Sequence, residues 1–146
     1  MEVVNAARAP VPAVYVRSVL RAAARLPEIA ARLADKPSTV AVRLTDDAEL
    51  RRLHGEFSAE DSATDVLSFS GADDHLGDLA ISWPAVVKQA HAHGHPPLTE
   101  LALLCVHGFL HLLGWDHATR PQRREMTRVT MAALALSGVS LAPGRL

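Results

Sequence analysis

Three histidines in the last third of the chain have a spacing that could bind a metal ion. His107 and His111 are four residues apart in an apolar stretch, and His117 follows them. On an α-helix, residues four apart lie one turn apart on the same face, so two imidazole rings can reach one ion. Gly114 can end such a helix with a positive φ, which would let the chain fold back and deliver His117. Three protein ligands leave one coordination position open, as in a catalytic zinc site.

The alternative interpretation is that His107 and His111 are ordinary core residues. Burying both rings on so apolar a helix without partners would cost about 1–3 kcal/mol for each ring. A third histidine beyond the helix-ending glycine makes a metal site the better interpretation.

Gly108 distinguishes this sequence from the metal-dependent peptidases. The spacing H-x-x-x-H-x-x-G-x-x-H matches the zinc ligands of the metzincin peptidases. Those enzymes carry a glutamate directly after the first histidine as the general base, whereas glycine has no side chain. We therefore expect the metal ligands to be present without peptidase activity of that mechanism.

Hydrolysis also needs a group that handles protons, and position 108 supplies none. Asp116, next to His117, is the candidate catalytic residue, although it could equally orient an imidazole ring. Asp65 and Asp78, at the ends of expected strands, are alternatives. Either of them could serve only in a cap or a turn.

The other five histidines have no comparable spacing. Three of them flank Gly94 in an H-A-H-G-H run, which could bind metal adventitiously but is typical of a solvated turn. Cys105 would point to another side of the helix than His107, and we interpret it as a small core residue. The unassigned histidines are His54, His75, His91, His93 and His95.

The elements that position these residues follow from apolar periodicity, prolines and glycines. Thr45 and Thr119 are expected N-caps. The strands are few and separated by helices, which predicts an α+β domain, or an α/β domain with a small sheet, with the most apolar helix buried. We expect a strand before Pro10 and strands over 39–44, 65–69 and 77–82. We expect helices over about 10–26, 45–57, 84–93, 99–113 and 120–137. Pro27 is expected at a break or at the first turn of a second short helix that reaches Leu33.

Length and composition limit the class of protein. The chain has 146 residues, of which 49% are hydrophobic and 21% charged, so it is expected to form one domain over residues 1–146 and not a disordered polyelectrolyte. A single cysteine excludes an intrachain disulfide and fits a reducing compartment. No apolar run approaches the roughly 18 residues of a membrane span. We expect a soluble cytoplasmic protein.

The formal charges are unevenly distributed along the chain. The net charge of −1 provides no overall basic field for nucleic acid. Residues 1–44 carry +4, residues 45–78 carry −8 and residues 79–146 carry +3. Arg120, Arg124 and Arg128 recur every four residues and could follow a phosphate backbone together with Arg123, or could form a solvated helix face.

The segment HGFLHLLGWDH, residues 107–117, resembles the signature of the YbeY family of bacterial endoribonucleases and rRNA maturation factors. Residues 64–69, TDVLSF, are similar to the central block of that family, and residues 76–79, LGDL, to its following strand. Glu100 falls where the family has a glutamate before the histidine helix. The resemblance covers about residues 40–136.

The resemblance implies a single α+β domain with a small, mostly four-stranded sheet, about five helices and a metal site at the end of a buried central helix. It implies one zinc ion held by His107, His111 and His117. It also implies a single-strand-specific endoribonuclease that acts in 16S rRNA 3′-end maturation and ribosome quality control. The implied partners are single-stranded RNA, above all rRNA, and the ribosomal small subunit or its assembly factors.

One segment departs from the family pattern. Many members carry N-x-x-Y-R-x-K-D before the central block, whereas residues 54–61 here read HGEFSAED. Ser58 replaces the arginine and Glu60 replaces the lysine, so a cation that would face phosphate is absent. Arg51, Arg52 or an arginine of the last helix could substitute for it.

Three functions of different classes are compatible with the sequence. The first is the zinc-dependent endoribonuclease. The second is a non-catalytic, zinc-stabilised binding protein of ribosome assembly, whose effects on rRNA are indirect. The third is another zinc hydrolase, such as a peptidase with a different base, which Gly108 disfavours.

Overall fold

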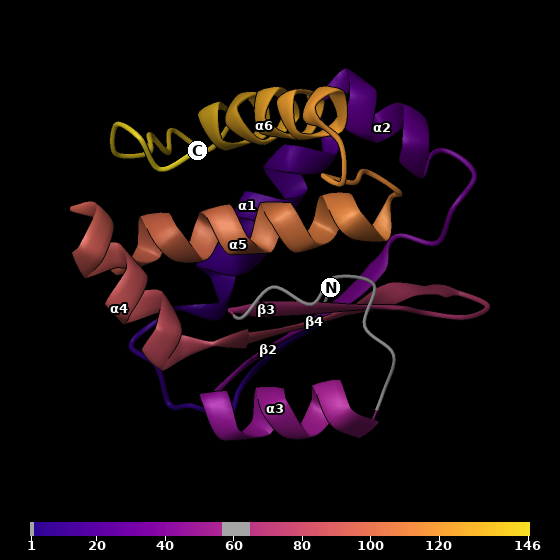
Figure 1. Cartoon of the computed structure of the whole chain (residues 1–146). Helices are drawn as coiled ribbons and strands as arrows, with labels where there is room; N and C mark the ends of the chain where they lie inside the picture. The colour runs from indigo at the N-terminus through magenta and orange to yellow at the C-terminus, as the bar shows by residue number, and fades with distance from the viewer. Residues whose placement is uncertain (1, 57–64) are drawn as a thin grey trace.

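A four-stranded mixed sheet forms the middle layer of the fold (Figure 1). The computed structural model describes residues 2–56 and 65–146. The strand order is β1-β2-β4-β3, in which β1, β2 and β4 are parallel and β3 runs antiparallel to β4. The strands are β1 (Glu2–Asn5), β2 (Thr39–Thr45), β3 (Val66–Ser70) and β4 (His75–Ser82).

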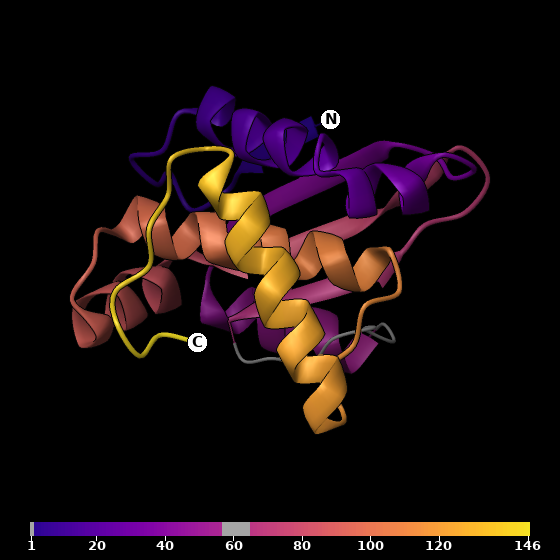
Figure 2. The ribbon, with the colours of Figure 1, turned by 90° about the horizontal axis from the view of Figure 1, so that it is seen from above.

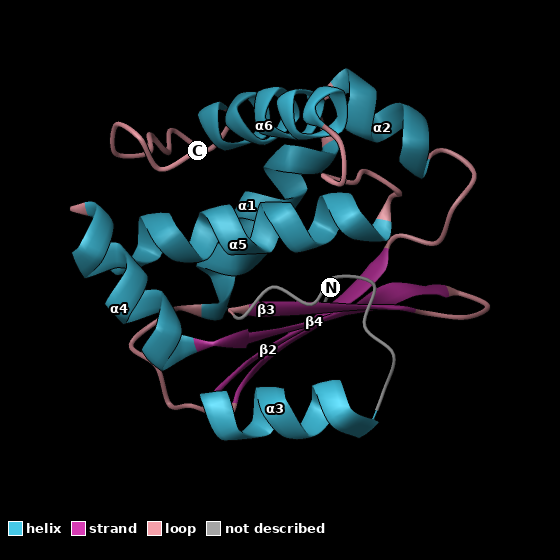
Figure 3. Cartoon of the chain, viewed as in Figure 1, coloured by secondary structure: helices cyan, strands magenta, loops and turns pink. Residues whose placement is uncertain are grey.

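Helices cover both faces of this sheet (Figure 3). Helix α5 packs on one face, with α1 beside it and α6 above it, while α3 lies alone on the opposite face (Figures 1 and 2). The predicted α+β class is confirmed, and Pro27 begins the second short helix that was one of its two predicted roles, α2. The six helices of the described residues are α1 (Ala13–Ala24), α2 (Pro27–Leu33), α3 (Asp47–Glu56), α4 (Trp83–His93), α5 (Pro97–Leu112) and α6 (Arg120–Ala135).

Helix α5 is the buried central helix that the sequence predicts. Residues 101–106 are all buried, as expected for a helix that is apolar on every side. Cys105 is among them, and burial raises the pKa of its thiol to about 12, so it is a core residue and not a nucleophile. Neither α5 nor any other helix among the described residues has both the length and the apolar character to cross a membrane.

Two glycines let α5 approach the sheet closely. A Cβ atom at Gly108 would lie 2.7 Å from Leu79 Cδ2, and one at Gly77 would lie 2.6 Å from Leu112 Cδ2. Ser68 Oγ, on β3, donates a buried hydrogen bond to the carbonyl oxygen of Gly108 at 3.4 Å. The histidine helix is therefore held directly against β3 and β4.

The predicted N-cap at Thr45 is wrong. Thr45 is the last residue of β2, where it pairs with Ser82 and is buried. Asp46 takes the capping role, because its Oδ1 accepts a hydrogen bond from the Glu49 N–H at 2.9 Å. Helix α5 also begins earlier than predicted, at Pro97, because proline suits the first turn of a helix.

Candidate metal centre

The three histidines predicted as ligands converge at the C-terminal end of α5. The ring centroids are 4.9 Å apart for His107 and His111, 5.4 Å for His107 and His117, and 4.9 Å for His111 and His117. One ring nitrogen from each residue lies within 4.8 Å of the others. Three imidazole nitrogens in this arrangement are a donor set that suits zinc and similar divalent transition metals.

The turn after α5 brings His117 back to the other two rings. The backbone N–H of Trp115 donates to the carbonyl oxygen of Leu110, and the backbone N–H of Gly114 donates to that of His111, both at 3.0 Å. This pair of hydrogen bonds is the Schellman motif, which requires a residue with positive φ. Gly114 provides it with a φ of 95°, as the sequence predicts.

Arg32 of helix α2 contacts the same turn through two interactions. The Arg32 guanidinium lies 3.5 Å from the centroid of the Trp115 ring, a cation–π contact. Arg32 Nη1 also donates to the Leu113 carbonyl oxygen at 3.2 Å. The backbone that carries His117 is thus fixed by a partner about 80 residues earlier in the chain.

Asp116 is exposed beside the triad. Its Oδ1 accepts a hydrogen bond from the His117 backbone N–H at 2.7 Å. The carboxylate therefore shapes the short loop that carries the third histidine. Whether it also handles protons stays a prediction.

Asp78 does not join this site. Its side chain lies on the sheet face that α3 covers, whereas neighbouring Gly77 faces Leu112 of α5. Asp78 Oδ1 instead lies 3.2 Å from His75 Nε2. Successive residues of a strand point to opposite faces, which is why this aspartate faces away from the triad.

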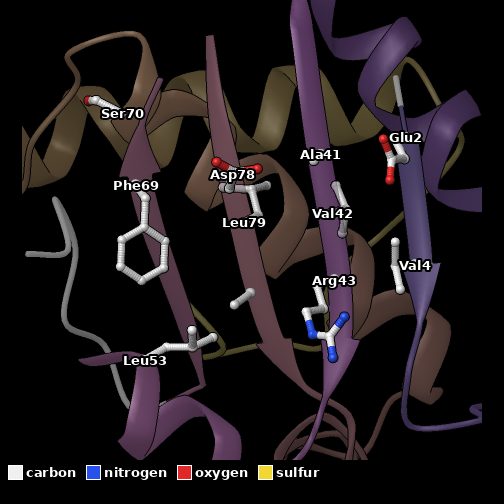
Figure 4. Close-up of a pocket in the computed structure, with 11 residues that line it drawn as sticks. Glu2, Val4, Ala41, Val42, Arg43, Leu53, Phe69, Ser70, Asp78 and Leu79 are labelled. Carbon is white, nitrogen blue, oxygen red and sulfur yellow. The ribbon is translucent and has the colours of Figure 1, made fainter. Parts of the chain in front are cut away.

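A hollow of about 500 Å³ occupies that opposite face, between the strands and α3 (Figure 4). Arg43, Leu53 and Phe69 line it together with Asp78. It is separated from the histidine triad by the sheet.

A smaller hollow of about 200 Å³ opens directly beside the triad. His107 and His117 form part of its wall, and Leu103 of α5, helix α6 and the C-terminal segment form the rest. No sequence motif marks these other lining residues, because they come from three separate segments. They are Leu103, Arg123, Met126, Thr127, Thr130 and Leu146.

His95 is not part of a solvated turn, contrary to the interpretation of the H-A-H-G-H run. Its side chain is 4% exposed, and its Nε2 lies 2.8 Å from Oε1 of the fully buried Glu100. Arg145 donates to both oxygens of Glu100, at 3.0 and 2.7 Å. The backbone N–H of Ala142 donates to His95 Nδ1 at 3.1 Å, so the C-terminal segment is bound to the start of α5.

The charges of this cluster act on one another strongly. Burial alone would raise the pKa of Glu100, but hydrogen bonds from Arg145 and His95 outweigh it and hold the pKa below the ordinary value. The hydrogen bond to Glu100 raises the pKa of Arg145, and the nearby Asp65 contributes to that rise. Asp65, an alternative candidate for proton handling, is thus close to Arg145.

The arginines suggested as substitutes for the absent cation lie on opposite sides of the sheet. Ser58 and Glu60 lie outside the described residues. Arg51 and Arg52 lie on α3, on the sheet face opposite α5, and Arg52 is paired with Glu56 at 3.0 Å. Among the residues proposed as substitutes, the arginines of α6 are on the side of the triad.

The fold and the three histidines together define an α+β domain with a candidate metal centre at the end of its central helix. A sequence model of the family described as Endoribonuclease YbeY matches residues 10–137. The chain belongs to the endoribonuclease YbeY family, which confirms the resemblance found in its sequence.

Individual relatives support this assignment. An endoribonuclease YbeY from Chloroflexus aurantiacus is 43% identical over 136 residues, which cover 80% of this chain and 86% of that protein. One from Gloeobacter violaceus is 48% identical over 111 residues, 68% of this chain and 56% of that protein, so the match spans little more than half of its length. The solution structure of a Thermotoga maritima protein has a TM-score of 0.61 at 19% identity and covers 99% of both chains, which shows a shared fold.

Proposed function

We propose that this protein is a zinc-dependent endoribonuclease that cleaves single-stranded RNA. We further propose that it matures the 3′ end of 16S rRNA, takes part in ribosome quality control, and meets the ribosomal small subunit or its assembly factors in the cytoplasm as a single domain over residues 1–146. The observation that carries the proposal is the convergence of three histidine rings in a chain of this family.

The donor set fits a zinc ion, which His107, His111 and His117 would hold. A bound zinc ion supplies Lewis-acid polarisation of a phosphoryl oxygen and activation of water at neutral pH. Two constraints position the three histidines: the rigid helix places His107 and His111, and the turn at Gly114 places His117.

Asp116 is the residue to which we assign proton handling. Its Oδ1 holds the loop through the His117 N–H, and Oδ2 is the atom assigned to accept a proton from the attacking water or 2′-hydroxyl. A carboxylate next to a ligand in an exposed loop is accessible to a polymeric substrate, which a deeply buried one would not be.

Gly108 argues against the peptidase alternative. The position faces Leu79 and Ser68 of the sheet, and a Cβ atom placed there would lie only 2.7 Å from Leu79 Cδ2. A carboxylate introduced at this position would be buried against apolar side chains and would lose its hydration. The site has no room for the general base that such peptidases place after the first histidine.

Single-histidine variants test the proposal. His117→Ala removes an exposed ligand and is expected to fold normally while losing the bound zinc and the cleavage of a single-stranded rRNA fragment. The matched control is His91→Ala, an exposed histidine on α4.

The control should keep both zinc and activity. If folded, zinc-free His117→Ala protein still cleaves RNA, the catalytic proposal fails. If neither the parent protein nor the His117→Ala variant cleaves RNA, yet both support rRNA maturation, the non-catalytic assembly protein is the better account.

A further inference from the structure

The first two turns of α6 expose arginines along a surface that begins at the histidine triad. Resting on the proposed function, we infer that Arg120, Arg123 and Arg124 bind the phosphodiester backbone of single-stranded RNA beside the cleavage site. We name this surface the α6 arginine groove and define it by these three arginines and Thr127.

The groove is continuous with the metal centre. The hollow of about 200 Å³ beside His107 and His117 is also lined by Arg123 and Thr127. The same two residues line a second hollow of about 470 Å³, whose other walls include Arg120 and Arg124. An RNA strand lying in both hollows would therefore run from the triad to the arginines.

The remaining arginine of α6, Arg128, already forms ion pairs within the protein and is therefore not counted in the groove. Arg128 forms ion pairs with Glu28 of α2 and Glu125 of its own helix, and these hydrogen bonds raise the pKa of its guanidinium. It therefore ties α6 to α2. From the sequence, Arg120, Arg124 and Arg128 could follow a phosphate backbone together with Arg123, or could form a solvated helix face. In the structure Arg128 is held in ion pairs within the protein, which leaves the other three arginines for the groove.

The other three arginines of α6 form no such ion pairs with the described acidic residues. Within the described residues, Arg120 and Arg124 form no ion pair with an acidic side chain, and both are exposed. Among the described residues, Arg123 Nη1 donates to two backbone carbonyl oxygens, those of His117 at 3.5 Å and Ala118 at 3.4 Å. In the part of the chain that the structure describes, three positive charges on one short surface thus have no acidic partner, although the net charge of the chain is −1.

Phosphate is the ligand that this chemistry favours. Guanidinium groups bind phosphate oxygens through paired, charge-assisted hydrogen bonds, and threonine hydroxyls are common additional donors to a nucleic-acid backbone. Arg120 and Arg124 are one helical turn apart on the same face, so they can contact the same strand in succession. Backbone contacts of this kind position a strand without selecting its sequence.

The test is binding of a short 2′-O-methylated oligouridine, which carries the phosphates but resists cleavage. The variant is Arg120→Gln with Arg124→Gln in the full-length protein. The control is Arg21→Gln with Arg25→Gln, an exposed pair with the same spacing and charge change at the end of α1. Affinity is measured by fluorescence anisotropy over a series of salt concentrations, and thermal unfolding checks that all three proteins fold.

We expect the groove variant to bind about tenfold more weakly at low salt. Its slope of log K against log salt should fall by about 1.4, since each phosphate contact on a single strand contributes about 0.7. Cleavage of an unmodified strand should show a raised KM with a smaller change in kcat. Binding and salt slope equal to those of the control pair would overturn the inference.

The two proposals fail in different ways. If the parent protein cleaves RNA and the groove variant binds the strand as the parent does, the RNA-binding role of the groove is wrong and the endoribonuclease proposal is unaffected. If the parent binds the modified strand through the arginines but cleaves no RNA, the groove stands and the endoribonuclease proposal fails. If the parent does not bind the strand at all, the groove is wrong.

Discussion

Gly108 illustrates how one residue can satisfy packing and chemistry together. From the sequence, the missing side chain predicts only the loss of a peptidase base. The structure adds that the position lies against Leu79 and Ser68, where α5 meets the sheet. That packing reason could not be predicted from the sequence, because the contact joins segments about 30 and 40 residues apart.

Gly108→Ala is expected to destabilise the protein by about 1–3 kcal/mol, because a Cβ at 2.7 Å from Leu79 Cδ2 overpacks the helix–sheet contact. Urea unfolding measures this. The control is Gly55→Ala on α3, where nothing lies within 4 Å of the new Cβ and the better helix propensity of alanine should stabilise by up to about 1 kcal/mol. Equal stability of the two variants would contradict the packing account.

Asp116→Asn separates a catalytic from a structural role of this carboxyl group. The asparagine Oδ1 can still accept the His117 N–H, so the loop and the zinc content should be unchanged. The loss of the proton acceptor should lower the cleavage rate by about 10²- to 10⁴-fold, measured under single-turnover conditions. A variant with full activity would assign Asp116 to the loop alone.

At the scale of elements, the ends of the two site-forming helices could be predicted closely. Thr119 caps α6 through a capping box with Gln122, and Gly114 ends α5, because both signals are local in sequence. The N-cap prediction at Thr45 was wrong for a physical reason. A threonine can end a strand as readily as it caps a helix, and here Thr45 pairs with Ser82 of β4 and so belongs to the strand.

Gly114→Ala tests whether the turn after α5 positions His117. A φ of 95° is strained for alanine and should cost about 1–2 kcal/mol of stability. If the turn relaxes to relieve this strain, His117 moves and zinc affinity falls, which competition with a chromogenic chelator measures.

The matched control is Gly138→Ala after α6, which has a φ of 69° and open space around its Cβ. It should lose similar stability but bind zinc as the parent does. Unchanged zinc affinity in both variants would show that the turn at Gly114 is not needed to place the third ligand.

At the scale of the whole molecule, the C-terminal segment is bound to the core by the buried cluster of His95, Glu100 and Arg145. The partners of Glu100 could not be predicted from the sequence, since Arg145 lies 45 residues away. Leu146, the neighbour of Arg145, lines both the hollow beside the triad and the adjoining hollow formed with the arginines of α6. The cluster therefore helps to form the wall of the candidate site as well as stabilising the fold.

Arg145→Gln should destabilise the protein by about 3 kcal/mol at neutral pH, because Glu100 is then left buried with His95 as its remaining partner. In the parent, the pKa of Glu100 lies below 4.5, so its contribution to stability is present above that pH and is lost as the pH falls further. In the variant, we expect burial to outweigh the remaining hydrogen bond from His95 and to raise the pKa of Glu100.

The difference in unfolding free energy between the parent and Arg145→Gln should therefore shrink as the pH falls, because protonation of Glu100 removes the unpaired buried charge. Urea unfolding at several pH values measures this, with Arg52→Gln as the control. Arg52 pairs with Glu56 on the surface, so its loss should cost less than about 1 kcal/mol. A deficit that stays constant or grows towards acid pH would contradict this assignment.

The most direct test of the central claim is the metal content of the purified protein, measured together with RNA cleavage. Elemental analysis should find about one zinc ion per chain, as a single three-histidine site requires. A chelator should abolish cleavage of single-stranded rRNA, and added zinc should restore it. Protein without metal that cleaves RNA, or cleavage that is indifferent to removal of the metal, would contradict the account.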